Sequence, residues 1–152
     1  MRLEALLVHQ LLDLQDRVDD ALRPRGAARD VDVHRDEPVD SLTDLTAVDY
    51  LNQGMPERFC VVYNLYSFKE NVRTRVKAFV PEGDASIDSV SALWKSAPWA
   101  EREVWDLFGI SFKGHPDLKR LLLPESYQGH PLRKDYPLTG KGERMDFPRY
   151  VP

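Results

Sequence analysis

The fold is decided by a stretch in the middle of the chain, FCVVYNLYSFKENVRTRVKAFV, residues 59–80. Apolar side chains alternate along both of its halves, which predicts two β-strands that each turn one face toward a core. Residues 67–71 between them are expected to connect the strands as a hairpin. In the second half, Arg73, Arg75 and Lys77 alternate with the apolar residues and are expected on the face that meets water.

The segments on either side of the hairpin predict further elements. Residues 42–51 are expected as a strand, with a turn at 52–54. After the hairpin, Ile87, Val90 and Trp94 recur at helical spacing and predict a short helix.

The next helix has both ends marked by residue type. Proline is favoured in the first turn of a helix, and Pro98 stands where this helix is expected to begin. Gly109 suits the left-handed residue that ends many helices, so the helix is expected to run to about Phe108. Ile110 and Phe112 after it are expected to lie in a short extended segment.

The N-terminal third carries the pattern of an amphipathic helix. Proline and glycine at positions 24 and 26 mark its end. Residues 31–33 are expected as a short strand. We therefore interpret residues 1–112 as a core domain in which residues 1–24 form an N-terminal amphipathic helix. The apolar stripe of that helix consists of Leu3, Leu7, Leu11, Leu14, Val18 and Leu22.

Residues 113–152 have the composition of an extended docking arm. They hold six of the eleven prolines, and proline interrupts helices and inner strands. They also carry more leucine and aromatic side chains than a disordered linker would have. We expect an arm that lies on another surface, either of its own core or of a partner. The predicted fold class is α+β: a small, mostly antiparallel sheet with helices on one side and an extended proline-rich C-terminal arm.

Composition and charge exclude several classes of function. The chain has 152 residues, a mass of 17.5 kDa and a formal net charge of −4. A pI near 5.6 lacks the basic footprint of a nucleic-acid-binding protein. Cys60 is the only cysteine, whereas an iron–sulfur cluster needs about four thiolates. The four histidines do not have the spacing of a zinc site, so no metal site is expected.

The charge is distributed unevenly along the chain. Residues 1–58 hold 7 basic and 13 acidic residues, a net charge of −6. Residues 113–152 hold 8 basic and 5 acidic residues, a net charge of +3. A basic arm on an acidic body suits docking onto an acidic protein neighbour.

Four charges are packed into residues 101–106, Glu101-Arg102-Glu103-Val104-Trp105-Asp106. Helical spacing predicts an ion pair between Arg102 and Asp106. A catalytic pair of carboxylates is the alternative, but Glu101 and Asp106 are five residues apart and would point to different sides of a helix. A structural charge network, internal or across an interface, is favoured.

The tripeptide Gly-His-Pro occurs twice, at 114–116 and 129–131. Its histidines, His115 and His130, could bind a metal or relay a proton. The favoured alternative is a repeated turn, in which glycine permits unusual φ angles and histidine caps by hydrogen bonding. The cluster at 133–137, Arg-Lys-Asp-Tyr-Pro, could contact phosphate or lipid, but a protein interface is favoured. No glycine-rich nucleotide loop is present in the sequence.

Two long runs resemble a known family. They are EREVWDLFGISFKGHPDLKRLLL at 101–123 and GHPLRKDYPL at 129–138. Their order, with both Gly-His-Pro turns in place, is similar to the signature of the 30 kDa subunit of NADH-quinone oxidoreductase, the respiratory complex I. The resemblance covers residues 42–138. The segment before it is shorter than is common in the family, because only residues 36–41 are available where a helix is usual.

The resemblance implies a non-catalytic structural subunit of the hydrophilic peripheral arm. Such a subunit has no redox centre, and FMN and iron–sulfur clusters belong to partner subunits. The expected main partner is the large subunit that forms much of the quinone site. The whole enzyme would pass electrons from NADH to quinone and couple this to proton translocation. The chain would be a peripheral membrane protein on the cytoplasmic face of the inner or plasma membrane, held there by the complex, with no nucleic-acid partner.

We expect no catalytic, cofactor-binding or metal-binding residues in this chain. The alternative function is the homologous subunit of a membrane-bound hydrogenase or of a ferredoxin–plastoquinone oxidoreductase. A remote alternative is a free-standing metal-dependent hydrolase that uses His115 and His130. The residues expected at the subunit interface are Glu101, Arg102, Glu103, Asp106, His115, Asp117, Arg133, Lys134, Asp135 and Tyr136.

Overall fold

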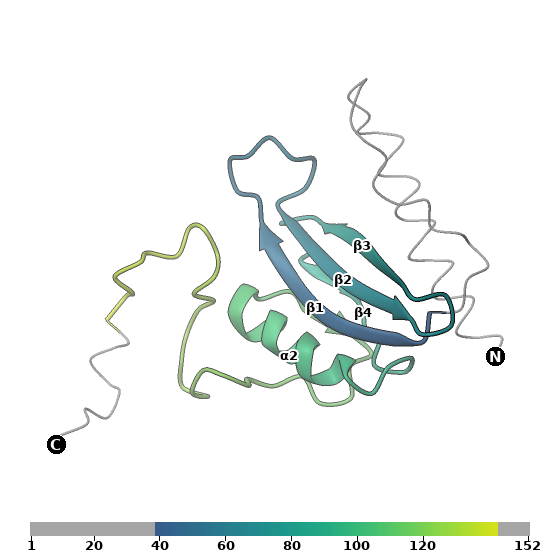
Figure 1. Cartoon of the computed structure of the whole chain (residues 1–152). Coiled ribbons are helices and arrows are strands. Elements are labelled where there is room, and N and C mark those ends of the chain that lie inside the picture. Colours follow the sequence, from purple (N-terminus) through teal and green to yellow (C-terminus); the bar gives the residue numbers. More distant parts are fainter. Residues whose placement is uncertain (1–38, 143–152) are drawn as a thin grey trace, which may run out of the picture.

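Three antiparallel strands in the order β1-β2-β3 form the main sheet of the computed structural model, which describes residues 39–142 (Figure 1). The strands are β1 (Ser41–Asp49), β2 (Phe59–Ser67) and β3 (Val72–Val80). The helix α2 (Ala97–Phe108) packs against one face of this sheet. The short strands β4 (Ser86–Asp88) and β5 (Ser111–Lys113) pair in parallel as a second sheet. The predicted α+β class is confirmed.

The hairpin formed by β2 and β3 follows the predicted alternation. Phe59 pairs with Val80 and Ser67 with Val72, so the register is continuous over both strands. The predicted apolar face of β2 is buried, and the three basic side chains of β3 are exposed. The connection closes through Asn71, whose φ of 53° is in the left-handed region that asparagine tolerates.

Strand β1 also forms where the sequence predicted it, but with a bulge that the pattern did not reveal. The pairing with β2 shifts between Leu42 and Asp44. Because of this extra residue, Leu42 and Leu45 both lie in the core although they are three residues apart. The predicted turn follows the strand, with a φ of 61° at Asn52 and of 69° at Gly54.

Helix α2 begins and ends as predicted. Pro98 lies in its first turn, and Gly109 ends it with φ 74° and ψ 27°. The amide of Gly109 donates to the carbonyl of Trp105 at 2.8 Å. Val104 and Phe108 on the inner side of the helix join the apolar cluster that lies between helix and sheet.

The short helix predicted around Ile87, Val90 and Trp94 is wrong. Ile87 lies in β4 and pairs with Phe112 of β5. The amide of Val90 donates to the side chain of Glu101 at 2.7 Å instead of to a helical carbonyl. Residues 91–93 and 95–96 form turns. Pairing with β5 and capture by a distant carboxylate therefore outweigh the local helical spacing.

Residues 114–142, called the strap below, contain no helix or strand and run from β5 along α2 (Figure 1). The predicted amphipathic helix at 1–24 and the predicted strand at 31–33 lie outside the described residues.

The tight end of α2 leads to a first prediction. A Cβ atom at position 109 would lie 2.5 Å from His130 Cδ2 and 2.6 Å from Arg133 Nη2. Gly109→Ala therefore adds a steric clash to the cost of a left-handed alanine, which is about 1–2 kcal/mol. We expect a loss in the free energy of unfolding of more than about 2 kcal/mol, measured by urea denaturation.

Gly54→Ala is the matched control. Its φ of 69° is similar, but an added Cβ would meet no atom within 4 Å. This variant should show only the backbone cost. Equal losses in the two variants would mean that the strap does not press on Gly109.

Candidate functional site

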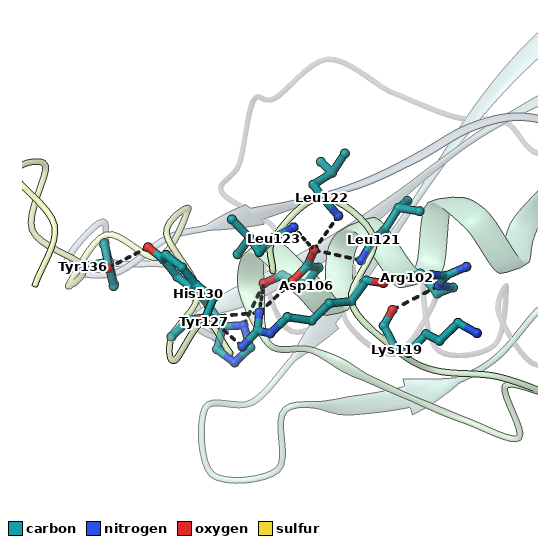
Figure 2. A network of polar contacts seen from close by, with 11 residues as sticks. Arg102, Asp106, Lys119, Leu121, Leu122, Leu123, Tyr127, His130 and Tyr136 are labelled. Atoms are coloured by element: carbon teal, nitrogen blue, oxygen red, sulfur yellow. Dashed lines mark hydrogen bonds and ion pairs between the residues drawn. The ribbon is translucent and has the colours of Figure 1, made fainter. Parts of the chain in front are cut away.

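The side chain of Asp106 joins α2 to the strap. Its carboxylate is fully buried. Oδ2 accepts hydrogen bonds from three consecutive amides, those of Leu121 at 3.0 Å, Leu122 at 2.8 Å and Leu123 at 2.9 Å (Figure 2). Oδ1 accepts from Nη1 of Arg120 at 2.7 Å. Burial would raise the pKa of Asp106, but these donors together hold it below the usual 3.8.

The strap also caps the C-terminal end of α2. His130 contacts the carbonyl of Asp106 through Nδ1 at 2.9 Å, and the amide of Leu132 donates to the carbonyl of Leu107 at 3.1 Å. Nε of Arg133 donates to the carbonyl of Phe108. The last carbonyls of a helix have no partner within it and carry partial negative charge, so these donors satisfy and stabilise that end. Burial lowers the pKa of His130, which favours a neutral ring that donates from Nδ1.

A second buried carboxylate, Asp49 at the end of β1, holds the strap further along. Its Oδ2 accepts from the amide of Lys134 at 2.8 Å and from Nη2 of Arg58 at 2.9 Å. The same Arg58 nitrogen lies 2.8 Å from Oδ1 of Asp135. Burial opposes ionisation of Asp49, but hydrogen bonds from Arg58 and from main-chain amides lower its pKa. The strap is therefore tied to the sheet as well as to the helix.

Glu101 is the third buried carboxylate, and it faces β4. Oε1 accepts from the amide of Val90 at 2.7 Å, and Oε2 is 2.6 Å from Oγ of Ser89. Nε2 of His115 is 3.9 Å from Oε2 and 3.0 Å from the carbonyl of Pro98. Burial raises the pKa of Glu101 above its usual 4.5 in spite of these partners. Asp106 and Glu101 thus lie on one helix but have pKa shifts of opposite sign.

Most of the ten residues predicted for the interface make contacts within the chain. Two carboxylates, Glu101 and Asp106, are fully buried. The strap contributes Arg133 and Asp135 through side-chain contacts and Lys134 through its amide. Of the remaining five, Arg102 binds the carbonyls of Lys119 and Arg120, and the ring of His115 lies 3.9 Å from the carboxylate of Glu101. Asp117 pairs with exposed Lys119, and Tyr136 is hydrogen-bonded to Tyr127. Glu103 is exposed.

The predicted ion pair between Arg102 and Asp106 is wrong. Nε of Arg102 donates to the carbonyl of Lys119 at 3.0 Å and Nη2 to that of Arg120 at 2.8 Å. The oxygens of Asp106 are taken by Arg120 and by the leucine amides. Arg102 and Asp106 therefore both bind the strap, and these contacts replace the ion pair predicted between them.

Sequence reasoning missed Asp49, Arg58 and Arg120. Asp49 ends β1, and Arg58 immediately precedes β2. One signal was available: Asp49 continues the buried face of β1 set by Leu45 and Ala47. The contact of Lys134 with Asp49 spans 85 residues, and no local pattern could reveal it.

The two Gly-His-Pro turns lie at opposite ends of α2. His115 binds the carbonyl of Pro98 and His130 that of Asp106, eight positions or about 12 Å apart along the helix. This separation is too large for both histidines to hold one metal ion. Within residues 39–142, no three His, Cys, Asp or Glu side chains are grouped as metal ligands would be. The same residues include no helix with the length and apolar character needed to cross a bilayer.

Asp106→Asn should destabilise the folded chain strongly at neutral pH. An amide has one acceptor where the carboxylate has two, and its NH₂ would face donors. We expect a loss of about 3–5 kcal/mol at pH 7, the usual cost of breaking a buried ion pair. Because folding lowers the pKa of Asp106, its contribution is complete above 3.8 and is lost as the pH falls through the lower folded value. Urea denaturation should show that the stability difference between Asp106→Asn and wild type becomes smaller in acid. Equal stability of the two chains at pH 7 would contradict this role of Asp106.

Glu101→Gln should have the opposite pH dependence. Folding raises the pKa of Glu101, so the wild-type chain loses stability as the pH rises from 4.5 through the folded value. Glutamine keeps an acceptor for Val90 and has no charge to bury. We expect the stability of the variant relative to wild type to rise between pH 4.5 and pH 7 in the same denaturation experiment. A constant difference over this range would exclude a raised pKa.

Comparison with known proteins identifies relatives of this chain. A NADH-quinone oxidoreductase subunit of Geobacter sulfurreducens, designated C, is 60% identical over 98 residues, which cover 64% of this chain and 60% of that protein. A NADH-quinone oxidoreductase subunit of Methylococcus capsulatus, designated C/D, is 50% identical over 107 residues, 67% of this chain and 18% of that protein. A solved structure described as the trypsin-resistant fragment (1-134) of Nqo5 has a TM-score of 0.50 at 46% identity, over 53% of this chain and 66% of that one.

These matches show how much of the chain is similar to its relatives. The chain spans about 60% of the length of the relative from Geobacter. The model of the family described as "Respiratory-chain NADH dehydrogenase, 30 Kd subunit" matches residues 23–142, which include both runs whose resemblance was noted and the whole described strap. The chain therefore belongs to the family of the 30 kDa subunit of respiratory-chain NADH dehydrogenase.

Proposed function

We propose that this chain is a non-catalytic structural subunit of a complex I-type NADH:quinone oxidoreductase. The observation that carries the proposal is the family match over residues 23–142. The buried carboxylates support a structural role, because each is occupied by donors of the chain itself. FMN and iron–sulfur clusters then belong to partner subunits, and the isolated chain has no oxidoreductase activity.

The proposed main partner is the large subunit that forms the quinone site. The C/D relative of Methylococcus capsulatus supports this choice. The region similar to this chain is only 18% of that protein, so one polypeptide combines it with a much larger part. The designation C/D is consistent with one polypeptide that combines two neighbouring subunits.

The proposed location follows from the complex. The chain would lie on the cytoplasmic face of the membrane and be held there by its partner subunits. It would support electron transfer from NADH to quinone, coupled to proton translocation, by helping to assemble the peripheral arm.

Affinity purification of the tagged full-length chain from its native membranes tests the proposal. In mild detergent we expect iron–sulfur, flavin-binding and membrane subunits to co-purify, identified by mass spectrometry, flavin absorbance and iron content. The eluate should reduce quinone with NADH, while the chain purified alone should not.

The control is the same purification from cells that carry only the tag. A lone, iron-free chain in the eluate would contradict the proposed function. A nickel-binding large subunit without an NADH-oxidising flavoprotein would assign the chain to a hydrogenase instead.

A further inference from the structure

The contacts of Asp106 determine which side chains of the strap meet solvent. The amides of Leu121, Leu122 and Leu123 all converge on Oδ2 of that carboxylate. A backbone held this closely on the buried side must direct side chains outward, as Figure 2 shows for Leu122. Leu122 is 61% exposed, and Leu121 and Leu123 are half-buried. A buried charge thus holds Leu122 at the surface between two half-buried leucines.

An exposed tryptophan on α2 is linked to the leucine segment through Arg102. Trp99 is 61% exposed, and the guanidinium of Arg102 lies 5.0 Å from the centre of its ring. The same guanidinium binds the carbonyls of Lys119 and Arg120, immediately before the leucines. Arg102 therefore links the tryptophan ring to the main chain just before the leucine triplet.

Three cations beside Trp99 and the leucines are bound within the chain. Arg102 is bound to two carbonyls and stacked on Trp99. Arg120 is bound to Asp106, and Lys119 pairs with Asp117 at 2.7 Å. Glu103 is exposed, lies one helical turn from Trp99, and has no hydrogen bond or ion pair with any residue of the described range 39–142. The surface thus offers apolar side chains bordered by the exposed carboxylate of Glu103, and Glu125, two residues beyond Leu123, is likewise exposed.

We propose that Trp99 and Leu121 to Leu123, the leucine–tryptophan patch, are the contact through which this subunit binds its neighbour. The partner presents an apolar, largely uncharged surface with a basic side chain placed to reach Glu103. Tryptophan is among the residues that most often carry the energy of an interface, and exposed apolar patches mark sites of protein–protein contact. This inference rests on the proposed function, because the neighbour is the large quinone-site subunit proposed above as the main partner.

The patch implies that docking depends on apolar contact rather than on charge. The basic residues of the strap were expected to bind an acidic neighbour. The strap arginines Arg120 and Arg133 instead bind groups within the chain, as does Arg58 before β2. Apolar contact with the partner therefore supplies the binding affinity. The charged groups of the strap hold it in the conformation that exposes the leucine–tryptophan patch.

Leu122→Glu and Trp99→Ala test the patch in full-length tagged chains that replace the native protein. We expect each to retain the folded state, because both side chains are mostly exposed. Each should lower the flavin and iron recovered per tagged chain by roughly tenfold, the effect of losing one strong interface anchor. The co-purified subunits are identified by mass spectrometry.

Phe68→Glu is the matched control, since Phe68 is 70% exposed at the β2–β3 connection, outside the patch. Its recovery should equal that of wild type. Circular dichroism and urea denaturation of each purified chain keep unfolding separate from loss of binding. Glu103→Lys should also lower recovery, because it places a cation opposite the basic group of the partner.

The outcomes separate the two proposals. Failure of the wild-type chain to recover any other subunit of the complex would overturn the proposed function. Normal recovery by wild type, Leu122→Glu and Trp99→Ala would overturn the patch alone. An equal loss in Phe68→Glu would also overturn it, because any added charge would then weaken assembly. A patch variant that only converts a dimer of this chain to a monomer would mean that a second copy occupies the patch.

Discussion

The carboxylate of Asp106 is the constraint on which the arrangement of the strap depends. A fully buried charge costs several kcal/mol unless donors surround it. Its donors are Arg120 and three consecutive leucine amides, and a chain can supply three amides to one oxygen only by bending closely around it. Helix and strap therefore cannot take up their native conformations independently. Once this bend is formed, the chain that follows is positioned to cap α2 and to reach Asp49.

The parts of the fold that the sequence could predict are those fixed by near neighbours. The alternation of residues 59–80 defines the β2–β3 hairpin, and Pro98 and Gly109 mark the ends of α2. The prediction failed where a distant group competes with local spacing. Val90 has helical neighbours, but its amide binds Glu101. Arg102 is placed for a helical ion pair, but carbonyls of the strap bind it instead. Such competition depends on tertiary contacts, which no short window of sequence contains.

The repeated Gly-His-Pro turn shows how one motif can serve two physical needs. His115 accepts the amide of Asp117 at Nδ1, so its Nε2 carries the proton and donates to the carbonyl of Pro98. His130 uses Nδ1 toward the carbonyl of Asp106. Both histidines bind main-chain carbonyls of α2, one in its first turn and one near its end. The spacing of the two turns thus matches a helix that the strap must follow, which explains a repeat that resembled a pair of metal ligands.

The burial of the charged residues also alters what the family signature means. Runs such as EREVWD and LRKDYPL look like a charged docking surface when read as sequence. In the structure, their carboxylates and guanidinium groups are largely bound to main-chain and side-chain groups of the same chain. A charge that is satisfied internally has little to offer a partner, since a new contact would have to replace an existing one. What the signature specifies is therefore the path of the strap, and recognition depends on exposed apolar side chains, chiefly Leu122 of the strap and Trp99 of α2.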